Sequence, residues 1–230
     1  MGIFANALTI ILGGFFGSKR RNKENAKEYR ILSIGIMIVS LVGFFENVYN
    51  VQGENIVSKN LIIVIFSYLL GSKIGELLLI EDKLSNLGKA SNKSLNAFLD
   101  ATLFFGIGGL QISGPVLLAV NNDNSQLFMK CFVDAPFAIA FGAAYGKVVS
   151  LSALPVAAIQ VLIALIAYLF SSVFSNELTA QLCATGYIIL FFSGFNLITD
   201  GKYKINNINM LPSIFFVILF NFIISIAERI

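Results

Sequence analysis

Long apolar runs alternate with short polar stretches along almost the whole chain. An α-helix needs about 20 apolar residues to cross a hydrocarbon core of about 30 Å, and most of the runs approach or exceed that length. We therefore predict an all-α fold, a polytopic bundle of about eight transmembrane helices forming one integral membrane domain over residues 1–230. The predicted spans are residues 3–18, 31–49, 60–80, 97–120, 128–149, 151–173, 178–199 and 208–227.

The composition supports a membrane protein. Of the 230 residues, 57% are hydrophobic and 13% are charged, and the mean hydropathy is +0.81. A soluble domain carries about 25% charged residues, so the chain holds about half the usual charge. The apolar runs leave no room for a separate soluble domain, and the lipid bilayer is the first expected partner.

Basic residues predict the orientation. Cytoplasmic loops of membrane proteins carry an excess of Lys and Arg. With the amino terminus outside, thirteen of the sixteen Lys and Arg lie in or beside cytoplasmic loops, and only Lys59, Lys130 and Arg229 fall on the other side. Eight spans then place both termini outside.

Several kinds of chemistry are excluded or disfavoured. The chain has no His and only two Cys, both inside predicted spans, so we expect no metal site and no cofactor. Nucleophile–base pairs, phosphate loops and dinucleotide fingerprints are missing, and we expect no enzymatic activity. Basic residues 19–30 lie beside a span, where topology and anionic lipid explain them better than nucleic acid does.

Asp134 is the one acidic residue predicted to lie well inside an apolar span. A charge at the bilayer centre costs about 2.5–3.5 kcal/mol on insertion scales, so such a residue usually faces a partner or a water-filled cavity. It would then bind a cation or a proton. Pro136 leaves a second interpretation open: if the helix began later, Pro136 would lie in its first turn and Asp134 would be an N-cap at the membrane surface.

Other polar groups suggest a site at a broken fourth span. Residues 106–115 contain four glycines and Pro115, and freed backbone groups of a broken helix commonly complete polar sites. The alternative is that each buried amide merely bonds a neighbouring helix. The predicted substrate-binding residues are Asn6, Gly108, Gly109, Ser113, Asp134, Gln160 and Asn196.

Glycines recur four residues apart near the ends of odd-numbered spans. In lipid this spacing lets helix backbones approach closely, within one subunit or between subunits, and we expect a homo-oligomer through these faces. The alternatives are that these glycines line a narrow path or that they allow a helix to break. The pairs are Gly13 and Gly17, Gly71 and Gly75, and Gly142 and Gly146.

A short internal similarity suggests an inverted repeat. Residues 103–110 (LFFGIGGL) resemble residues 190–197 (LFFSGFNL), and the spans that contain them run in opposite directions. Inverted repeats are common in secondary transporters. Chance similarity between segments rich in Phe, Leu and Gly is the alternative.

Several segments together carry a family resemblance. The most specific is Leu70–Leu78 (LGSKIGELL) with Ile80 and Glu81 after it. The other matching segments are residues 6–8, 11–17, 84–88, 101–105, 130–135, 152–156 with Gln160, 196–197 and 211–212. With these segments the chain resembles the DUF554 family of uncharacterised bacterial inner-membrane proteins, and Pro136 departs from the pattern, which has an ordinary apolar residue or Gly there. The resemblance covers essentially the whole chain and implies a multi-pass protein of the bacterial cytoplasmic membrane.

Two functions fit this sequence. The first is a secondary transporter or channel for a small solute or ion, with its polar site around Asp134; charge alone weakly favours a cation. The second is a non-transporting scaffold or signalling partner whose polar residues hold helices together. They differ in whether the polar side chains share one hydrated cavity or scatter among separate contacts.

Overall fold

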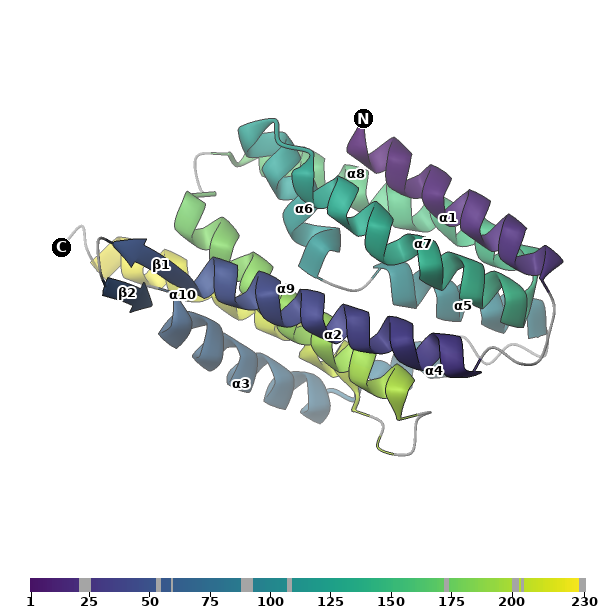
Figure 1. Cartoon of the computed structure of the whole chain (residues 1–230). Helices are drawn as coiled ribbons and strands as arrows, with labels where there is room; N and C mark the ends of the chain where they lie inside the picture. The colour runs from purple at the N-terminus through teal and green to yellow at the C-terminus, as the bar shows by residue number, and fades with distance from the viewer. Residues whose placement is uncertain are drawn as a thin grey trace.

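A computed structural model shows a bundle of α-helices with one short hairpin (Figure 1). It describes residues 1–20, 26–52, 55–58, 60–87, 93–106, 109–171, 174–199, 203 and 205–227. The helices are α1 (Gly2–Lys19), α2 (Ala26–Val48), α3 (Leu61–Leu77), α4 (Ile80–Leu87), α5 (Lys93–Gly106), α6 (Gly109–Asn121), α7 (Ser125–Tyr145), α8 (Ala153–Leu169), α9 (Asn176–Ile198) and α10 (Pro212–Ala227).

Two 3-10 helices and a hairpin join the longer helices. The 3-10 helix η1 (Lys147–Ser152) leads into α8, and η2 (Asn207–Met210) leads into α10. Strands β1 (Tyr49–Gln52) and β2 (Asn55–Ser58) pair antiparallel, with Tyr49 opposite Ser58 and Gln52 opposite Asn55. They lie between the predicted spans 31–49 and 60–80, for which the sequence predicts no strand.

The bundle has two groups of helices with α6 between them. In Figure 1, α1 lies along α7 in the upper group, and α2 lies along α9 in the lower group; these are the two most extensive helix contacts. The second group is completed by α3, which packs on α10. Because α6 contacts α7, α8 and α9, it places its side chains at the centre of the molecule.

The all-α prediction is confirmed, but the count of eight spans is not. Among the described residues, five helical segments are long and apolar enough to cross a membrane, and the bent pair α5–α6 makes a sixth if it is one span. The five are Gly2–Lys19, Ser125–Tyr145, Lys147–Leu169, Asn176–Asn196 and Asn207–Ala227. Eight would require α2 and α3 to cross as well, and α3, with 17 residues, is only about 26 Å long.

The expected interruption of the fourth span is present. Helix α5 ends at Gly106, α6 begins at Gly109, and the two segments are bent by 53°. The similar segment 190–197 lies inside the continuous helix α9. The two segments of the proposed repeat therefore have different conformations.

Most of the paired glycines form helix contacts within the chain. A Cβ added to Gly17 would lie 1.9 Å from the Ile139 carbonyl oxygen on α7, and one on Gly75 would lie 1.8 Å from the Asn209 carbonyl oxygen. Gly146, at φ +87°, instead ends α7 in a backbone conformation that favours glycine. Since these faces are covered within one chain, a homo-oligomer would need another surface.

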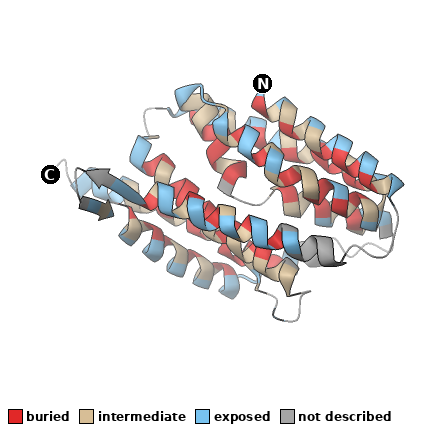
Figure 2. Ribbon diagram, viewed as in Figure 1, coloured by how far each residue is buried: buried red, intermediate tan, exposed pale blue. Residues whose placement is uncertain are grey.

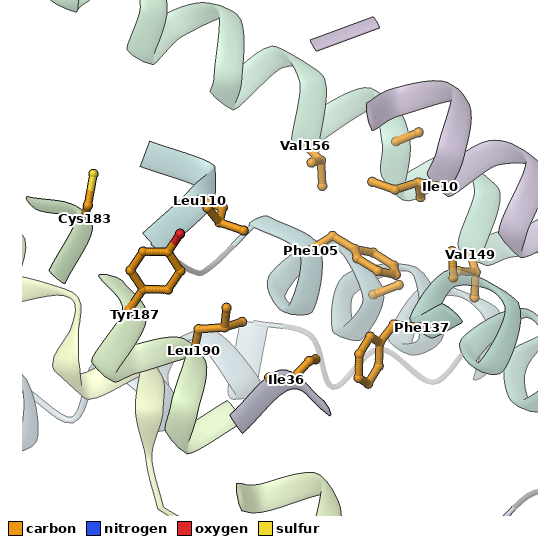
Figure 3. Close-up of a cluster of buried hydrophobic side chains, with 13 residues drawn as sticks. Ile10, Ile36, Phe105, Leu110, Phe137, Val149, Val156, Cys183, Tyr187 and Leu190 are labelled. Atoms are coloured by element: carbon orange, nitrogen blue, oxygen red, sulfur yellow. The ribbon is translucent and has the colours of Figure 1, made fainter. Parts of the chain in front are cut away.

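The molecule is apolar on its outer surface and carries many polar groups inside. Figure 2 shows exposed residues on the outward faces of the helices and buried ones between them. Many exposed side chains are large and hydrophobic, such as Phe132 and Leu154, as expected for contact with lipid. In Figure 3, Phe105 at the end of α5 and Leu110 at the start of α6 both lie in the central hydrophobic cluster, so both helix ends reach the core.

Candidate functional site

Asp134 lies inside helix α7, not at its start. The helix begins at Ser125, so Asp134 is its tenth residue, about 14 Å along the axis, and it is buried. Pro136 follows within the same helix and removes one backbone N–H from its hydrogen-bond ladder. The alternative in which Asp134 caps a later helix start is therefore wrong.

The partner of this carboxylate is Lys130, one turn earlier on the same helix. The Lys130 Nζ lies 2.8 Å from Asp134 Oδ2, and the two residues are 5% and 4% exposed. The positive-inside count places Lys130 on the outer side of the membrane; in the structure its side chain is buried within the bundle, in the second turn of α7. The ion pair compensates the charge of Asp134 within the apolar bundle.

Lys130 also reaches the broken span. Its Nζ donates a hydrogen bond of 2.9 Å to the carbonyl oxygen of Phe105, the penultimate residue of α5. The last carbonyls of a helix have no partner within that helix. Lys130 therefore joins α7 to the end of α5 at the break.

Three amide side chains extend the site across the bundle. Asn6 on α1 donates through Nδ2 to Asp134 Oδ2 at 2.8 Å. Gln160 on α8 donates through Nε2 to Asn6 Oδ1 at 3.2 Å and to Gln111 Oε1 at 3.0 Å. Gln111 on α6 donates in turn to the Val156 carbonyl oxygen at 3.1 Å. The central polar network, defined as Asn6, Gln111, Lys130, Asp134 and Gln160, thus connects four helices.

A small cavity adjoins the central polar network. It has a volume of about 20 Å³, and Gln111, Lys130 and Asp134 line it together with apolar side chains of α2, α5, α6, α7 and α9. That volume accommodates one water molecule, given polar partners. The Oε1 atom of Gln160 is buried and has no hydrogen-bond partner among the described residues. The network therefore adjoins a space for one small occupant, and it contains one acceptor oxygen without a hydrogen-bond partner among the described residues.

The other predicted site residues lie elsewhere. The Ser113 hydroxyl on α6 bonds Gln126 Oε1 on α7, and Gln126 Nε2 lies 3.6 Å from Cys183 Sγ on α9. Gly109 is the first residue of α6, and Gly108 falls outside the described residues. Of the predicted set, the structure brings together Asn6, Asp134 and Gln160.

Asn196 fixes a connection at the end of α9. Its Nδ2 donates to the Ile205 carbonyl oxygen at 2.6 Å, and its Oδ1 accepts the Ile205 N–H at 2.8 Å. The predicted convergence of Asn196 with Gln160 at the break is therefore wrong. Both polar atoms of its amide form hydrogen bonds with the backbone of the segment that leads to α10.

A further amide cluster links α3, α9 and α10. Gln181 Nε2 donates to Asn60 Oδ1 at 3.1 Å, and Asn221 Nδ2 donates to Gln181 Oε1. These groups satisfy one another and hold neighbouring helices together. Asn221 thus fulfils the expectation that a membrane amide bonds an adjacent helix.

The central polar network is suited to binding and less suited to bond making. Its charges cancel, its amides offer fixed donors and acceptors, and its cavity is lined by both an ammonium and a carboxylate. Polar and charged groups of this kind inside a membrane bundle mark substrate or ion paths and proton relays.

Comparison with known proteins places this bundle in a family. The family model described as "Protein of unknown function (DUF554)" matches residues 1–222. The chain belongs to the DUF554 family. Two relatives are the "Uncharacterized membrane protein YdfK" of Bacillus subtilis (strain 168), 26% identical over 93% of this chain and 92% of the relative, and the "Uncharacterized protein YqgA" of Escherichia coli (strain K12), 25% identical over 93% of each. No solved structure matches the chain.

Membership in DUF554 confirms the resemblance seen in the sequence, and with the apolar helices it supports a membrane protein. Two residues of the network, Lys130 and Gln111, were missed as site residues. Lys130 stands four residues before Asp134, and this spacing places the two side chains on one helix face, which is a signal that could have paired them. Gln111 lies within residues 106–115, the segment predicted to interrupt the fourth span.

Proposed function

We propose that this DUF554 protein is a secondary transporter or channel for a small solute or ion, and that it is not an enzyme. The observation that carries the proposal is the buried Lys130–Asp134 pair beside the break between α5 and α6. Helix packing alone does not need a buried ion pair, because apolar residues of similar volume are often equally or more stabilising. Discontinuous helices with a polar site near the bilayer midplane are common in secondary transporters.

The position of the network fits alternating access. It lies where α1, α6, α7 and α8 meet, and the cavity is also lined by α2 and α9, so both groups of helices contribute. A movement of one group against the other would open this point to one side of the membrane. The occupant would then exchange with water on that side.

A non-transporting scaffold is the second candidate. The separate contacts of Ser113, Asn196 and the Asn60–Gln181–Asn221 cluster favour it, because they use polar groups purely to join elements. The central polar network differs from these contacts in having a cavity and an unpartnered acceptor.

Location and orientation belong to the same proposal. We place the protein in the bacterial cytoplasmic membrane with both termini outside. Lys19 at the end of α1 and Lys147 after α7 both lie over the Phe15 ring, at 4.5 and 5.7 Å, so these two basic residues share one end of the bundle. The positive-inside rule makes that end cytoplasmic.

Uptake into proteoliposomes tests the transport proposal. Wild-type protein is compared with Asp134→Asn and with Asn221→Leu, a matched amide control outside the network, across cations, amino acids and small organic acids. We expect at least one solute to be taken up by wild type and by Asn221→Leu and not by folded Asp134→Asn. Failure of wild type to move any solute of a broad panel would favour the scaffold.

A further inference from the structure

The Lys130 ammonium has the oxygen ligands of a bound monovalent cation. Its Nζ lies 2.8 Å from a carboxylate oxygen of Asp134 and 2.9 Å from the Phe105 carbonyl oxygen. Carboxylate and carbonyl oxygens are also the ligands that hard metal cations take in proteins. An ammonium group is close to K⁺ in size and carries the same charge.

We infer that Lys130 fills a cation-binding position with its own side chain, and that Na⁺ or K⁺ can bind there only when this side chain is shortened. The inference rests on the proposed transport function for its biological meaning, but the binding position stands on geometry. In the wild-type protein the covalently attached cation takes the place that a coupling metal ion would occupy.

The electrostatics of the position favour a single positive charge. Phe105 is the penultimate residue of α5, and the carbonyl end of a helix carries partial negative charge. Asp134 supplies a full negative charge, and Asn6 holds that carboxylate in place through a bond of 2.8 Å. With Lys130 present the pair is neutral, so a second cation would add an uncompensated charge inside the bundle, which is costly.

The surroundings offer space. The cavity of about 20 Å³ borders Lys130, Asp134 and Gln111, and removal of the lysine stem would enlarge it. An ion in the enlarged space would meet the Asp134 carboxylate oxygen and the Phe105 carbonyl oxygen that Lys130 now contacts.

The arrangement has a consequence for coupling. Lys130 joins α7 to the end of α5, so any motion at the break must separate the ammonium from Phe105 or carry both along. A sodium- or potassium-coupled transporter would control that contact by binding and releasing the ion. In this protein the Lys130 side chain makes the contact with Phe105 permanently. Transport by the wild-type protein should therefore not depend on a gradient of Na⁺ or K⁺.

Thermal unfolding of the purified full-length protein tests the inference without a substrate. All proteins carry Cys131→Ser, because Cys131 is a second, partly exposed thiol, and unfolding is followed through the reaction of buried Cys183 with a fluorogenic maleimide, in KCl, NaCl or choline chloride at one ionic strength. We expect the midpoints of wild type and Lys130→Arg to be the same in all three salts. The unfolding midpoint of Lys130→Ala should rise by about 2–4 °C in KCl or NaCl relative to choline chloride, and the rise should saturate with salt concentration, because a ligand that binds only the folded state stabilises it. The double variant Lys130→Ala/Asp134→Asn should lose that rise.

Three outcomes would overturn the inference. One is Lys130→Ala with equal midpoints in all salts. Another is a wild-type midpoint that rises specifically in KCl or NaCl and loses this rise in Asp134→Asn. The third is Lys130→Ala that fails to fold in every salt while Lys130→Met folds; rescue of its folding by KCl or NaCl would instead support the position. Since none of these results depends on uptake, the cation-binding position and the transport proposal can fail separately.

Discussion

Replacing Lys130 by Met should destabilise the protein far more than replacing both members of the ion pair. The substitution keeps most of the side-chain volume but leaves Asp134 buried, 4% exposed, with only the Asn6 amide as a described side-chain donor. Removing one member of a buried pair typically costs about 3–5 kcal/mol, whereas exchanging both for neutral groups is often close to neutral.

The magnitude follows from the geometry. In Lys130→Met/Asp134→Asn the new amide oxygen can still accept from Asn6, so only the bond to Phe105 is lost, at about 1 kcal/mol. For a chain of this size each 1 kcal/mol shifts the midpoint by about 2–4 °C. We therefore expect the single variant to melt about 6–20 °C below wild type and the double variant within about 5 °C of it.

Thermal unfolding in detergent with choline chloride as the only salt gives both values, and yields of monodisperse protein serve as a control for expression. The reasoning would be refuted if the single variant lost less than about 1 kcal/mol. It would also be refuted if the double variant lost as much as the single one, because the cost would then come from packing and not from an uncompensated charge.

Four further substitutions separate packing from function. Gly17→Ala should prevent stable folding, because its Cβ would lie 1.9 Å from the Ile139 carbonyl oxygen. Gly35→Ala, whose Cβ would have no atom within 4 Å, should be neutral or stabilising by up to about 1 kcal/mol. Equal melting temperatures of the two variants would contradict this reasoning. Asn196→Leu should lower the free energy of unfolding by about 1–3 kcal/mol, because two hydrogen bonds to the backbone are lost, and should leave uptake by the folded fraction intact. If the variant had normal stability but no uptake, Asn196 would belong to the site. Gln160→Leu should cost about 1–2 kcal/mol and abolish uptake, and full uptake would remove it from the site.

The convergence of Asn6, Asp134 and Gln160 could be anticipated from the sequence because of where they lie. A polar side chain in the middle of an apolar run is costly to leave without a hydrogen-bond partner in lipid, so such side chains tend to bond one another. The glycine-rich interruption of the fourth span was predictable for a similar reason, since Gly and Pro weaken a helix at a fixed place.

The pairing of Lys130 with Asp134 could have been predicted from the sequence. Both residues lie in the predicted span 128–149, and their i, i+4 spacing places them on one helix face whether the helix begins at Phe128 or at Ser125. The positive-inside count grouped Lys130 with the residues on the outer side, and Asp134 was therefore interpreted as a lone carboxylate.

The positions of Asn196 and Ser113 could not be derived from the sequence. Periodicity tells which face of a helix is polar, but it does not tell which neighbour that face meets. Asn196 binds the backbone of Ile205, nine residues ahead, and Ser113 meets Gln126 across the α6–α7 turn. Both contacts depend on how the chain returns after a helix end.

Access of water to the central polar network tests the transport account most directly, since no substrate has to be known. In a Cys131→Ser/Cys183→Ser background, Gln111→Cys places one thiol on the cavity, and Thr185→Cys places one at a buried position outside its lining. Membrane-impermeant maleimides are applied to right-side-out and to inverted vesicles. We predict that the thiol at position 111 is labelled from at least one side and the thiol at position 185 from neither. If neither thiol is labelled from either side while a loop cysteine reacts fully, the network is a sealed packing core, and transport through it is contradicted.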